Sequence, residues 1–172
     1  MTITFDKQSR VLFTRVKGHF YLNIQIVCEG STDEDEIEFI YDTAAFITVI
    51  NKENYMRHGL DKLPRIKSPL SGYAGSTEGY IFQIPGLVIG KRLLSGVWAF
   101  TPESDNLRQN LLGSNVVEYF RPLQDNLNDC FYFSDNPEPK PYAVANSSFS
   151  LACDKVMFVE EYIKGEWKYG AE

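Results

Sequence analysis

The sequence predicts an all-β domain that carries one or two short helices. It contains 12 Phe and 10 Tyr among 172 residues, and aromatic residues are enriched in strands. Several short apolar or alternating segments are separated by glycine and proline, which is typical of strands joined by turns. The length suits one compact domain and is short for two, so we expect a single site.

The first strands are expected between residues 10 and 28. Phe20, Leu22, Ile24 and Ile26 alternate with polar residues, and Lys17-Gly18 supplies a turn before them. This segment is therefore predicted to be a hairpin. The acidic stretch that follows, residues 30–36 (GSTDEDE), is predicted to be a solvated loop.

Residues 37–50 (IEFIYDTAAFITVI) form two apolar segments that a small polar patch interrupts. An Asp at position 42, between runs that should be buried, is costly unless it is hydrogen-bonded or functional. Asp42 is therefore the main candidate for chemistry. The alternative is a turn or capping aspartate with no chemical role, because Asp-Thr is common in turns.

A short helix is predicted over residues 51–60, with Asn51 as N-cap and Gly59 as the C-terminal stop. Residues 64–70 contain two prolines and are expected to be an extended connection. The stretch after them, residues 71–79, has three glycines and is either a glycine-rich loop or a hairpin between strands.

Three strands are predicted next, over residues 80–84, 87–89 and 93–100, with turns at Pro85-Gly86 and at residues 90–92. The remaining predictions are a short apolar segment with a turn over residues 111–115, a helical turn over 116–120, a strand over 130–133, a proline-rich stretch over 137–141, and either strands or a helix over 149–169. The Met and aromatic residues of positions 155–167 are assigned to packing or to a dimer contact.

Composition excludes several classes of function. The formal net charge of −6 argues against a nucleic-acid partner, which requires clustered basic residues. No apolar run approaches the roughly 20 residues that cross a bilayer, and the N-terminus lacks the apolar core of a signal peptide. We therefore expect a soluble cytoplasmic protein without a membrane partner.

The three cysteines, Cys28, Cys130 and Cys153, are far apart and odd in number. This pattern suits neither a disulfide framework nor a metal knuckle, and buried structural thiols are the expectation. His19 and His58 show no zinc-binding spacing. Neither a metal nor another cofactor is expected.

Four features in order resemble the retropepsin-like aspartic proteases, the single-domain relatives of retroviral protease. Residues 40–50, with Asp-Thr-Ala-Ala and then Thr-Val-Ile, look like the catalytic loop of that family. The helix ending in His58-Gly59-Leu60 is similar to one that commonly ends in Gly-Leu. Residues 72–79 look like the flap hairpin, and residues 110–117 (NLLGSNVV) resemble the apolar-apolar-Gly segment that packs behind the catalytic loop.

The resemblance implies a closed β-barrel in which each residue of these motifs has a role. Asp42 is the implied catalytic carboxylate. The implied supporting residues are Thr43, Ala44 and Ala45 in the catalytic loop, Tyr73, Ala74, Gly75, Ser76 and Thr77 in the substrate-binding flap, and Leu112 and Gly113 in the second loop. The family usually has glycine at the position of Ala44, so activity depends on whether the loop accepts a methyl group there.

The implied activity is hydrolysis of a protein or peptide by an aspartic endopeptidase. Two carboxylates share one proton in this chemistry, one acting as base and the other as acid. Only one Asp-containing loop of this type is present, so the resemblance implies a homodimer with two Asp42 residues near its axis. The alternatives are a non-catalytic domain of the same fold that binds a peptide or assembles a complex, and an unrelated β-barrel binding module.

Two regions are predicted along the chain. Residues 1–136 are expected to form the retropepsin-like domain. Residues 137–172 are expected to form a C-terminal extension that packs on this domain or at the dimer interface.

Overall fold

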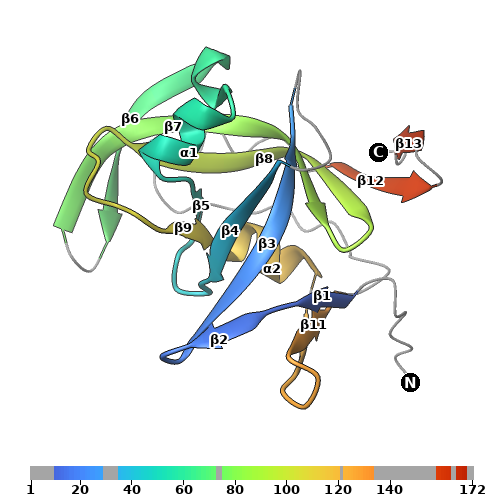
Figure 1. Ribbon diagram of the computed structural model, residues 1–172. Coiled ribbons are helices and arrows are strands. Elements are labelled where there is room, and N and C mark those ends of the chain that lie inside the picture. Colours follow the sequence, from blue (N-terminus) through green and yellow to red (C-terminus); the bar gives the residue numbers. More distant parts are fainter. Residues whose placement is uncertain are drawn as a thin grey trace.

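The computed structural model describes residues 10–28, 35–72, 75–120, 122–133, 158–163 and 166–169. Strands dominate these residues, and the helices among them are short (Figure 1). The prediction of an all-β fold with one or two short helices is thus confirmed. None of the helices in the described part of the chain is long and apolar enough to cross a membrane.

The elements follow one another closely along the chain. They are β1 (Arg10–Leu12), β2 (Thr14–Val16), β3 (His19–Val27), β4 (Glu36–Tyr41), β5 (Thr48–Val49), α1 (Lys52–Arg57), the 3-10 helix η2 (Leu60–Lys62), β6 (Arg65–Gly72), β7 (Gly75–Ile89), β8 (Arg92–Pro102), β9 (Asn110–Leu112), α2 (Ser114–Phe120), β10 (Leu123–Asp125), β11 (Cys130–Tyr132), β12 (Phe158–Ile163) and β13 (Glu166–Tyr169).

Most strands belong to one large sheet with the order β13-β12-β8-β5-β9-β4-β3-β7-β6, and β2 pairs with β3 beside this path. An additional pairing of β7 with β8 brings the hydrogen-bonded path β8-β5-β9-β4-β3-β7 back to β8. A small second sheet has the order β1-β11-β10. The parallel pairs β4–β9 and β5–β8 lie in the middle of the large sheet.

The predicted hairpin at the N-terminal end is present as β2 and β3. Lys17 and Gly18 both have positive φ, at 50° and 84°. These values suit a two-residue hairpin turn, whose twist matches that of the flanking strands. The preceding strand differs from the prediction because it divides at Phe13. Residues 10–12 pair with β11, whereas residues 14–16 pair with β3. At the division, the Phe13 ring packs against the rings of Phe20 and Phe131.

The predicted helix over residues 51–60 is present as α1 followed by η2. The Asn54 N–H donates to the Asn51 side chain at 2.8 Å, so Asn51 is the N-cap as predicted. Gly59 has a φ of 67° and separates the two helices. The second predicted helical turn is α2, which begins at Ser114, two residues earlier than expected.

Two predictions between residues 64 and 89 were wrong. Residues 65–72 are a strand, β6, that pairs with β7, and not a connection. Pro85-Gly86 does not separate two strands, because β7 runs through them. The β7–β8 register passes from Ile84 with Val97 to Gly86 with Ser95, so Pro85 lies where no ladder pair is needed. The predicted turn after residue 89 is present.

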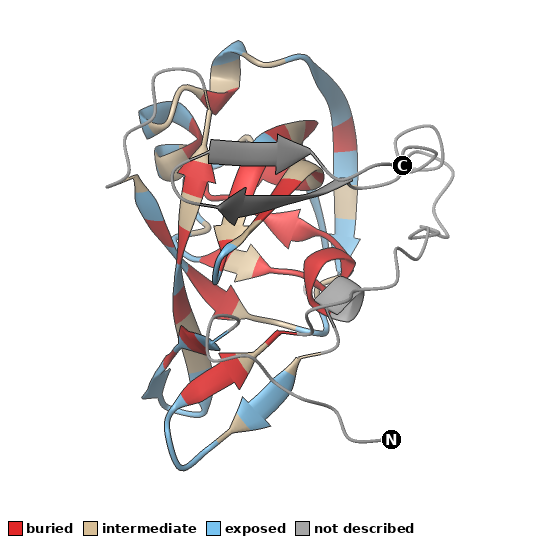
Figure 2. Cartoon of the chain, turned by 90° about the vertical axis from the view of Figure 1, so that its right-hand side faces the viewer, coloured by how far each residue is buried: buried red, intermediate tan, exposed pale blue. Residues whose placement is uncertain are grey.

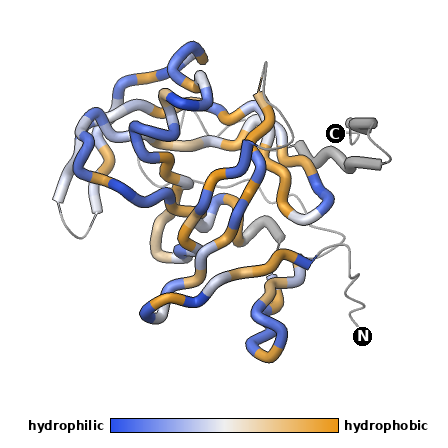
Figure 3. Tube along the Cα trace, in the orientation of Figure 1, coloured by the Kyte–Doolittle hydropathy of each residue, from blue (hydrophilic) through white to orange (hydrophobic). Residues whose placement is uncertain are grey.

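The main core lies between the strands and consists of large apolar side chains. Hydrophobic and hydrophilic residues alternate along β3 and β4, as Figure 3 shows, so each strand buries one face. Figure 2 shows the buried residues gathered on the strands of the sheet. Phe39, Phe82 and Phe131 are among the largest fully buried side chains.

The C-terminal residues that the structure describes are strands, which the sequence left open between strand and helix. β12 pairs antiparallel with β8, and β13 pairs with β12. The proline-rich residues 137–141 and most of the acidic stretch 30–36 lie outside the described residues. The division into regions 1–136 and 137–172 stays a prediction.

Candidate active site

Asp42 follows the last residue of β4, where two parallel strands of the sheet end side by side. Tyr41 of β4 pairs with Leu112 of β9, and the chain then turns through residues 42–47 before β5 begins. The loop lies next to the start of α2 (Figure 1). The tertiary structure thus brings the predicted catalytic loop and the predicted second loop together.

Main-chain groups hold Asp42. Its N–H donates to the Leu112 carbonyl at 3.1 Å, and its own carbonyl accepts the Ala45 N–H at 3.3 Å. The Asp42 carboxylate accepts the Ala44 N–H at 2.9 Å through Oδ1. Asp42 is half-buried, whereas Thr43 and Ala44 are exposed. The carboxylate therefore has a fixed direction at a corner that a substrate or a partner chain can reach.

Ala44 stands where the retropepsin-like proteases usually have glycine. The φ angle at position 44 shows whether alanine fits the backbone there. Outside glycine, only Lys17 and Asp129 have positive φ among the described residues. Ala44 therefore does not need the left-handed backbone that favours glycine. The φ angle at this position is compatible with the methyl group.

The segment after β9 packs directly against the back of the loop. The Ser114 N–H donates to the Ala45 carbonyl at 2.7 Å. A Cβ atom at Gly113 would lie 2.6 Å from the Ile47 carbonyl oxygen and 2.7 Å from the Thr48 nitrogen. Both distances are too short for a real contact, so only glycine permits this approach.

We expect Gly113→Ala to lower the free energy of unfolding by about 1 to 3 kcal/mol, because backbone must move to admit the methyl group. Urea unfolding followed by circular dichroism measures this effect. Gly72→Ala is the matched control, because a Cβ at Gly72 meets no atom within 4 Å. Equal losses in the two variants would contradict the packing argument.

Buried asparagines that the sequence did not single out fix the strands around the loop. The Asn110 amide oxygen accepts the Asn51 N–H at 2.8 Å, and its amide nitrogen donates to the Glu38 carbonyl at 3.0 Å. Asn115 lies in the predicted second-loop segment, residues 110–117, but had no predicted role. Its amide oxygen accepts the Thr48 N–H, and its amide nitrogen donates to the Trp98 carbonyl. Asparagines within an apolar segment are the only sequence signal for these contacts.

The predicted flap residues lie at the end of a long hairpin formed by β6 and β7. The register of β6 and β7 ends with Gly72 opposite Gly75. Tyr73 and Ala74 lie outside the described residues. Gly75, Ser76 and Thr77 are exposed on β7. Of the two structures that the sequence left open, a glycine-rich loop and a hairpin, the structure has the hairpin. The role of these residues as a substrate-binding flap stays a prediction.

An apolar cluster connects this hairpin with the Asp42 loop. Its buried members are Ile47, Val49, Ile81 and Phe100, and it is separate from the main core. Further members are only partly covered by the rest of the chain: Phe46, Leu70, Trp98, Leu107 and Leu111. Because Leu70 pairs with Thr77 near the tip, the outer part of the hairpin shares one cluster with the loop.

A polar network anchors the hairpin to the end of β8. The Tyr80 hydroxyl donates to a Glu103 carboxylate oxygen at 2.8 Å, and the Lys67 ammonium lies 3.1 Å from the same oxygen. These hydrogen bonds, from Tyr80 and then Lys67, hold the pKa of Glu103 below its ordinary value. The Glu103 N–H also donates to the Glu78 carbonyl at 3.0 Å.

This network predicts a pH dependence of stability. Because the folded pKa of Glu103 is lowered, the charged form stabilises the fold above the ordinary glutamate pKa, and this contribution is lost as pH falls through the folded value. The difference in unfolding free energy between wild type and Glu103→Gln should therefore shrink on acidification from neutral pH. Urea titrations at several pH values measure it.

Glu53→Gln is the control for this prediction. Glu53 forms an ion pair with Arg57 on α1, but its side chain is 74% exposed, against 38% for Glu103. Exposed helix pairs contribute little, so this substitution should change stability only slightly at any pH. A Glu103→Gln difference that stayed constant down to strongly acidic pH would refute the network.

Cys28 supports the interpretation of a structural thiol. Its Sγ donates to the His58 carbonyl at 3.2 Å, and burial, followed by the Asp35 charge, raises the pKa of the thiol. Cys130 is buried, and Cys153 lies outside the described residues. No group of three or more metal-ligating His, Cys, Asp or Glu side chains occurs in the described ranges.

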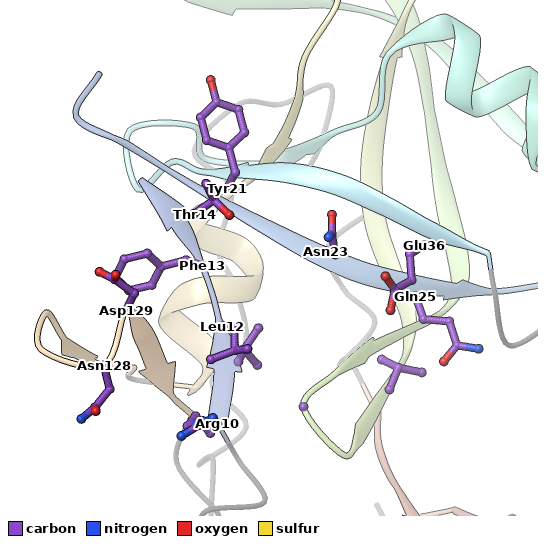
Figure 4. A pocket seen from close by; sticks show the side chains of 13 residues that line it. Arg10, Leu12, Phe13, Thr14, Tyr21, Asn23, Gln25, Glu36, Asn128 and Asp129 are labelled. Atoms are coloured by element: carbon purple, nitrogen blue, oxygen red, sulfur yellow. The ribbon is translucent and has the colours of Figure 1, made fainter. Parts of the chain in front are cut away.

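A hollow of about 590 Å³ lies between the small sheet and β3. Figure 4 shows Arg10 and Leu12 of β1 on one side and Asn23 and Gln25 of β3 on the other. Among the described residues of the two predicted site segments, 42–45, 72 and 75–79, none lines it. It is therefore no part of the candidate site around Asp42.

Comparisons with known proteins support the fold and the family. A crystal structure of a retropepsin-like aspartic protease from Rickettsia conorii is similar to the chain, with a TM-score of 0.54 and 24% sequence identity, covering 72% of this chain and 87% of that one. This likeness confirms the predicted retropepsin-like fold. No curated protein matches the sequence. The family model described as aspartyl protease matches residues 28–116, just over half of the 172 residues. The chain therefore belongs to the aspartyl protease family.

Proposed function

We propose that this protein is an aspartic endopeptidase that acts as a homodimer, with Asp42 from each chain in one shared site. The observation that carries the proposal is the position of Asp42 in a chain of this family. Its carboxylate projects from an accessible corner, and the Ala44 N–H fixes its direction. A catalytic carboxylate needs both accessibility and a fixed geometry.

The second carboxylate is proposed to come from a second copy of the chain. Among the described residues, no other Asp or Glu side chain is hydrogen-bonded to Asp42. Two carboxylates must lie within hydrogen-bond reach to share one proton. A two-fold axis beside the half-buried Asp42 and the exposed Thr43 and Ala44 would place one Asp42 opposite the other.

The chemistry follows from the shared proton. The ionised Asp42 takes a proton from a water molecule as the water oxygen attacks the scissile carbonyl carbon. The protonated Asp42 of the other chain donates to the carbonyl oxygen, and a tetrahedral diol forms. Return of a proton to the amide nitrogen breaks the C–N bond and releases a carboxylic acid and an amine.

The other predicted site residues would serve this reaction without taking part in proton transfer. Ala44 and Ala45 hold the loop through their main-chain groups, and Thr43 stands exposed beside them, where the partner chain would approach. The hairpin residues Gly75, Ser76 and Thr77, together with Tyr73 and Ala74, would cover the peptide and exclude water.

The apolar cluster beside the loop suggests which peptides would bind. Phe46, Leu107 and Leu111 are only partly covered by their own chain. Burying such a surface against apolar side chains of a peptide removes apolar area from water and so favours binding. We therefore expect cleavage between or beside apolar residues of the substrate.

The runner-up is a non-catalytic domain of the same fold that binds peptides. It would follow if the methyl group of Ala44 occupied space that the substrate or the second Asp42 needs. The backbone at Ala44 does not favour this alternative, because its φ angle is not one that requires glycine. The two functions differ in whether bound peptides acquire new termini.

Incubation with a peptide library in ¹⁸O-labelled water tests the proposal. We expect new C-termini that carry one ¹⁸O atom, formed only at acidic to neutral pH. Sedimentation under the same conditions should show a dimer. Binding of library peptides without cleavage would favour the runner-up, and a monomer that cleaves would contradict the shared site.

A further inference from the structure

One peptide group stands directly behind Asp42 and is hydrogen-bonded at both ends. The carbonyl oxygen of Leu112 accepts the Asp42 N–H at 3.1 Å. The N–H of the same peptide unit belongs to Gly113 and donates to the Thr48 hydroxyl oxygen at 3.2 Å. Because a peptide unit is planar and rigid, its two ends cannot turn independently. The Thr48 hydroxyl therefore influences the direction in which Leu112 holds Asp42.

The Thr48 hydroxyl is itself fixed by a buried asparagine. It donates to the Asn115 amide oxygen at 3.0 Å, and the Thr48 N–H donates to the same oxygen at 2.8 Å. The Asn115 amide nitrogen donates to the Trp98 carbonyl of β8 at 2.8 Å. Thr48 has 0% and Asn115 has 5% of its surface exposed, so water does not compete for these bonds.

We propose that Thr48 and Asn115 are positioning residues for Asp42, acting through the Leu112–Gly113 peptide group. This inference rests on the proposed peptidase function for its kinetic consequences, but its structural part does not. The chain of contacts runs from β8 through Asn115 and Thr48 to Gly113, and from Leu112 to the main chain of Asp42.

The main chain at Gly113 lies close to the loop, and this closeness lets Thr48 act on the Leu112–Gly113 peptide group. A side chain at this position would meet the backbone of Ile47 and Thr48, so the absence of one lets the Gly113 main chain lie directly against them. At this short range the Gly113 N–H reaches the Thr48 hydroxyl, and this hydrogen bond helps to set the orientation of the peptide group. In a shared site both copies of Asp42 depend on this contact, so a shift of about 1 Å in each chain would strongly reduce the rate.

Thr48→Val and Thr48→Ser form a matched pair for the test. Valine has the shape of threonine without the hydroxyl, whereas serine keeps the hydroxyl and loses only a methyl group. We expect Thr48→Val to lower kcat at least about tenfold and to leave KM within about twofold, because peptide contacts are unchanged. Thr48→Ser should recover most of the lost kcat.

The pH profile separates positioning from simple loss of folded protein. When two carboxylates move apart they couple less, so the acidic and basic limbs of the rate profile of Thr48→Val should approach each other. A smaller folded fraction would lower the whole curve without moving its limbs. Ile26→Val, in the main core and away from the loop, serves as the control that only destabilises.

Hydrogen exchange supplies a readout that needs no enzymatic activity. The amides of Asp42 and Gly113 should exchange at least about tenfold faster in Thr48→Val than in Thr48→Ser. In Ile26→Val the same two amides should exchange as slowly as in Thr48→Ser. Equal exchange in both Thr48 variants would overturn the inference even if the protein cleaves peptides. A wild type that cleaves nothing would instead refute the proposed function, and exchange would still decide the inference.

Discussion

Asp42→Asn is expected to reduce peptide hydrolysis at least about a thousandfold while leaving the fold and the dimer intact. Asparagine has the shape of aspartate, and its amide oxygen can still accept the Ala44 N–H that now bonds to Oδ1. The amide cannot take a proton from water at ordinary pH, and it cannot donate an acidic proton to the substrate. The substitution thus removes the base and the acid together, since the same residue fills both roles in the two chains.

The assay compares initial rates of peptide cleavage, with circular dichroism and sedimentation to check the fold and the dimer. Asp61→Asn is a matched control because Asp61, in η2, is half-buried like Asp42 and lies outside the loop. Its rate should stay within about twofold of wild type, as for most substitutions away from a site. Undiminished turnover by Asp42→Asn would exclude the proposed mechanism.

Much of this fold was predictable because its local signals are strong. The Lys17-Gly18 turn, the Asn51 cap and the αL residue Gly59 each depend on a few neighbouring residues, and the structure has all three. The position of Asp42 between two buried strands was predictable for a similar reason. A polar interruption in an apolar run is visible in the sequence itself.

The errors arose where distant residues decide the structure. Residues 65–72 form β6 because β7 offers a partner strand over its whole length, which no local pattern in a proline-containing segment indicates. The sequence predicts a strand end at Pro85, but an unpaired position in the β7–β8 ladder tolerates it. Tertiary pairing overrode local propensity in both places.

The support of the candidate site was the least predictable part. In the sequence, Thr48 stands out only as the first residue of the Thr-Val-Ile motif. Asn115 is only one of the polar residues after Gly113. Their contact joins positions 67 apart in the sequence, and its meaning depends on the orientation of one peptide group. Sequence patterns predict which segments are buried, but they do not show which buried polar groups bond to one another.

The second large effect is expected when wild-type and Asp42→Asn chains are mixed. If each site needs Asp42 from both chains, a mutant chain inactivates every wild-type chain with which it pairs. With equal amounts and random exchange, only about a quarter of the dimers keep two aspartates, whereas independent sites would leave about half of the activity. Activity should therefore fall with the square of the wild-type fraction.

The experiment unfolds and refolds the two chains together at several ratios and then measures total peptidase activity. A tagged wild-type chain, mixed with untagged wild type, controls for exchange, because mass spectrometry of intact dimers shows whether pairing is random. Total activity in this control should not depend on the ratio, so any loss in the mutant series comes from Asp42 itself.

The shape of the curve decides where the second carboxylate lies. A quadratic fall requires two copies of Asp42 in one site, which agrees with a loop that contains one accessible carboxylate per chain. A straight line would mean that Asp42 works with another acid of its own chain, since each wild-type chain would then keep its full activity whatever its partner. The proposed homodimeric site would be wrong in that case, although the family and the fold would stand.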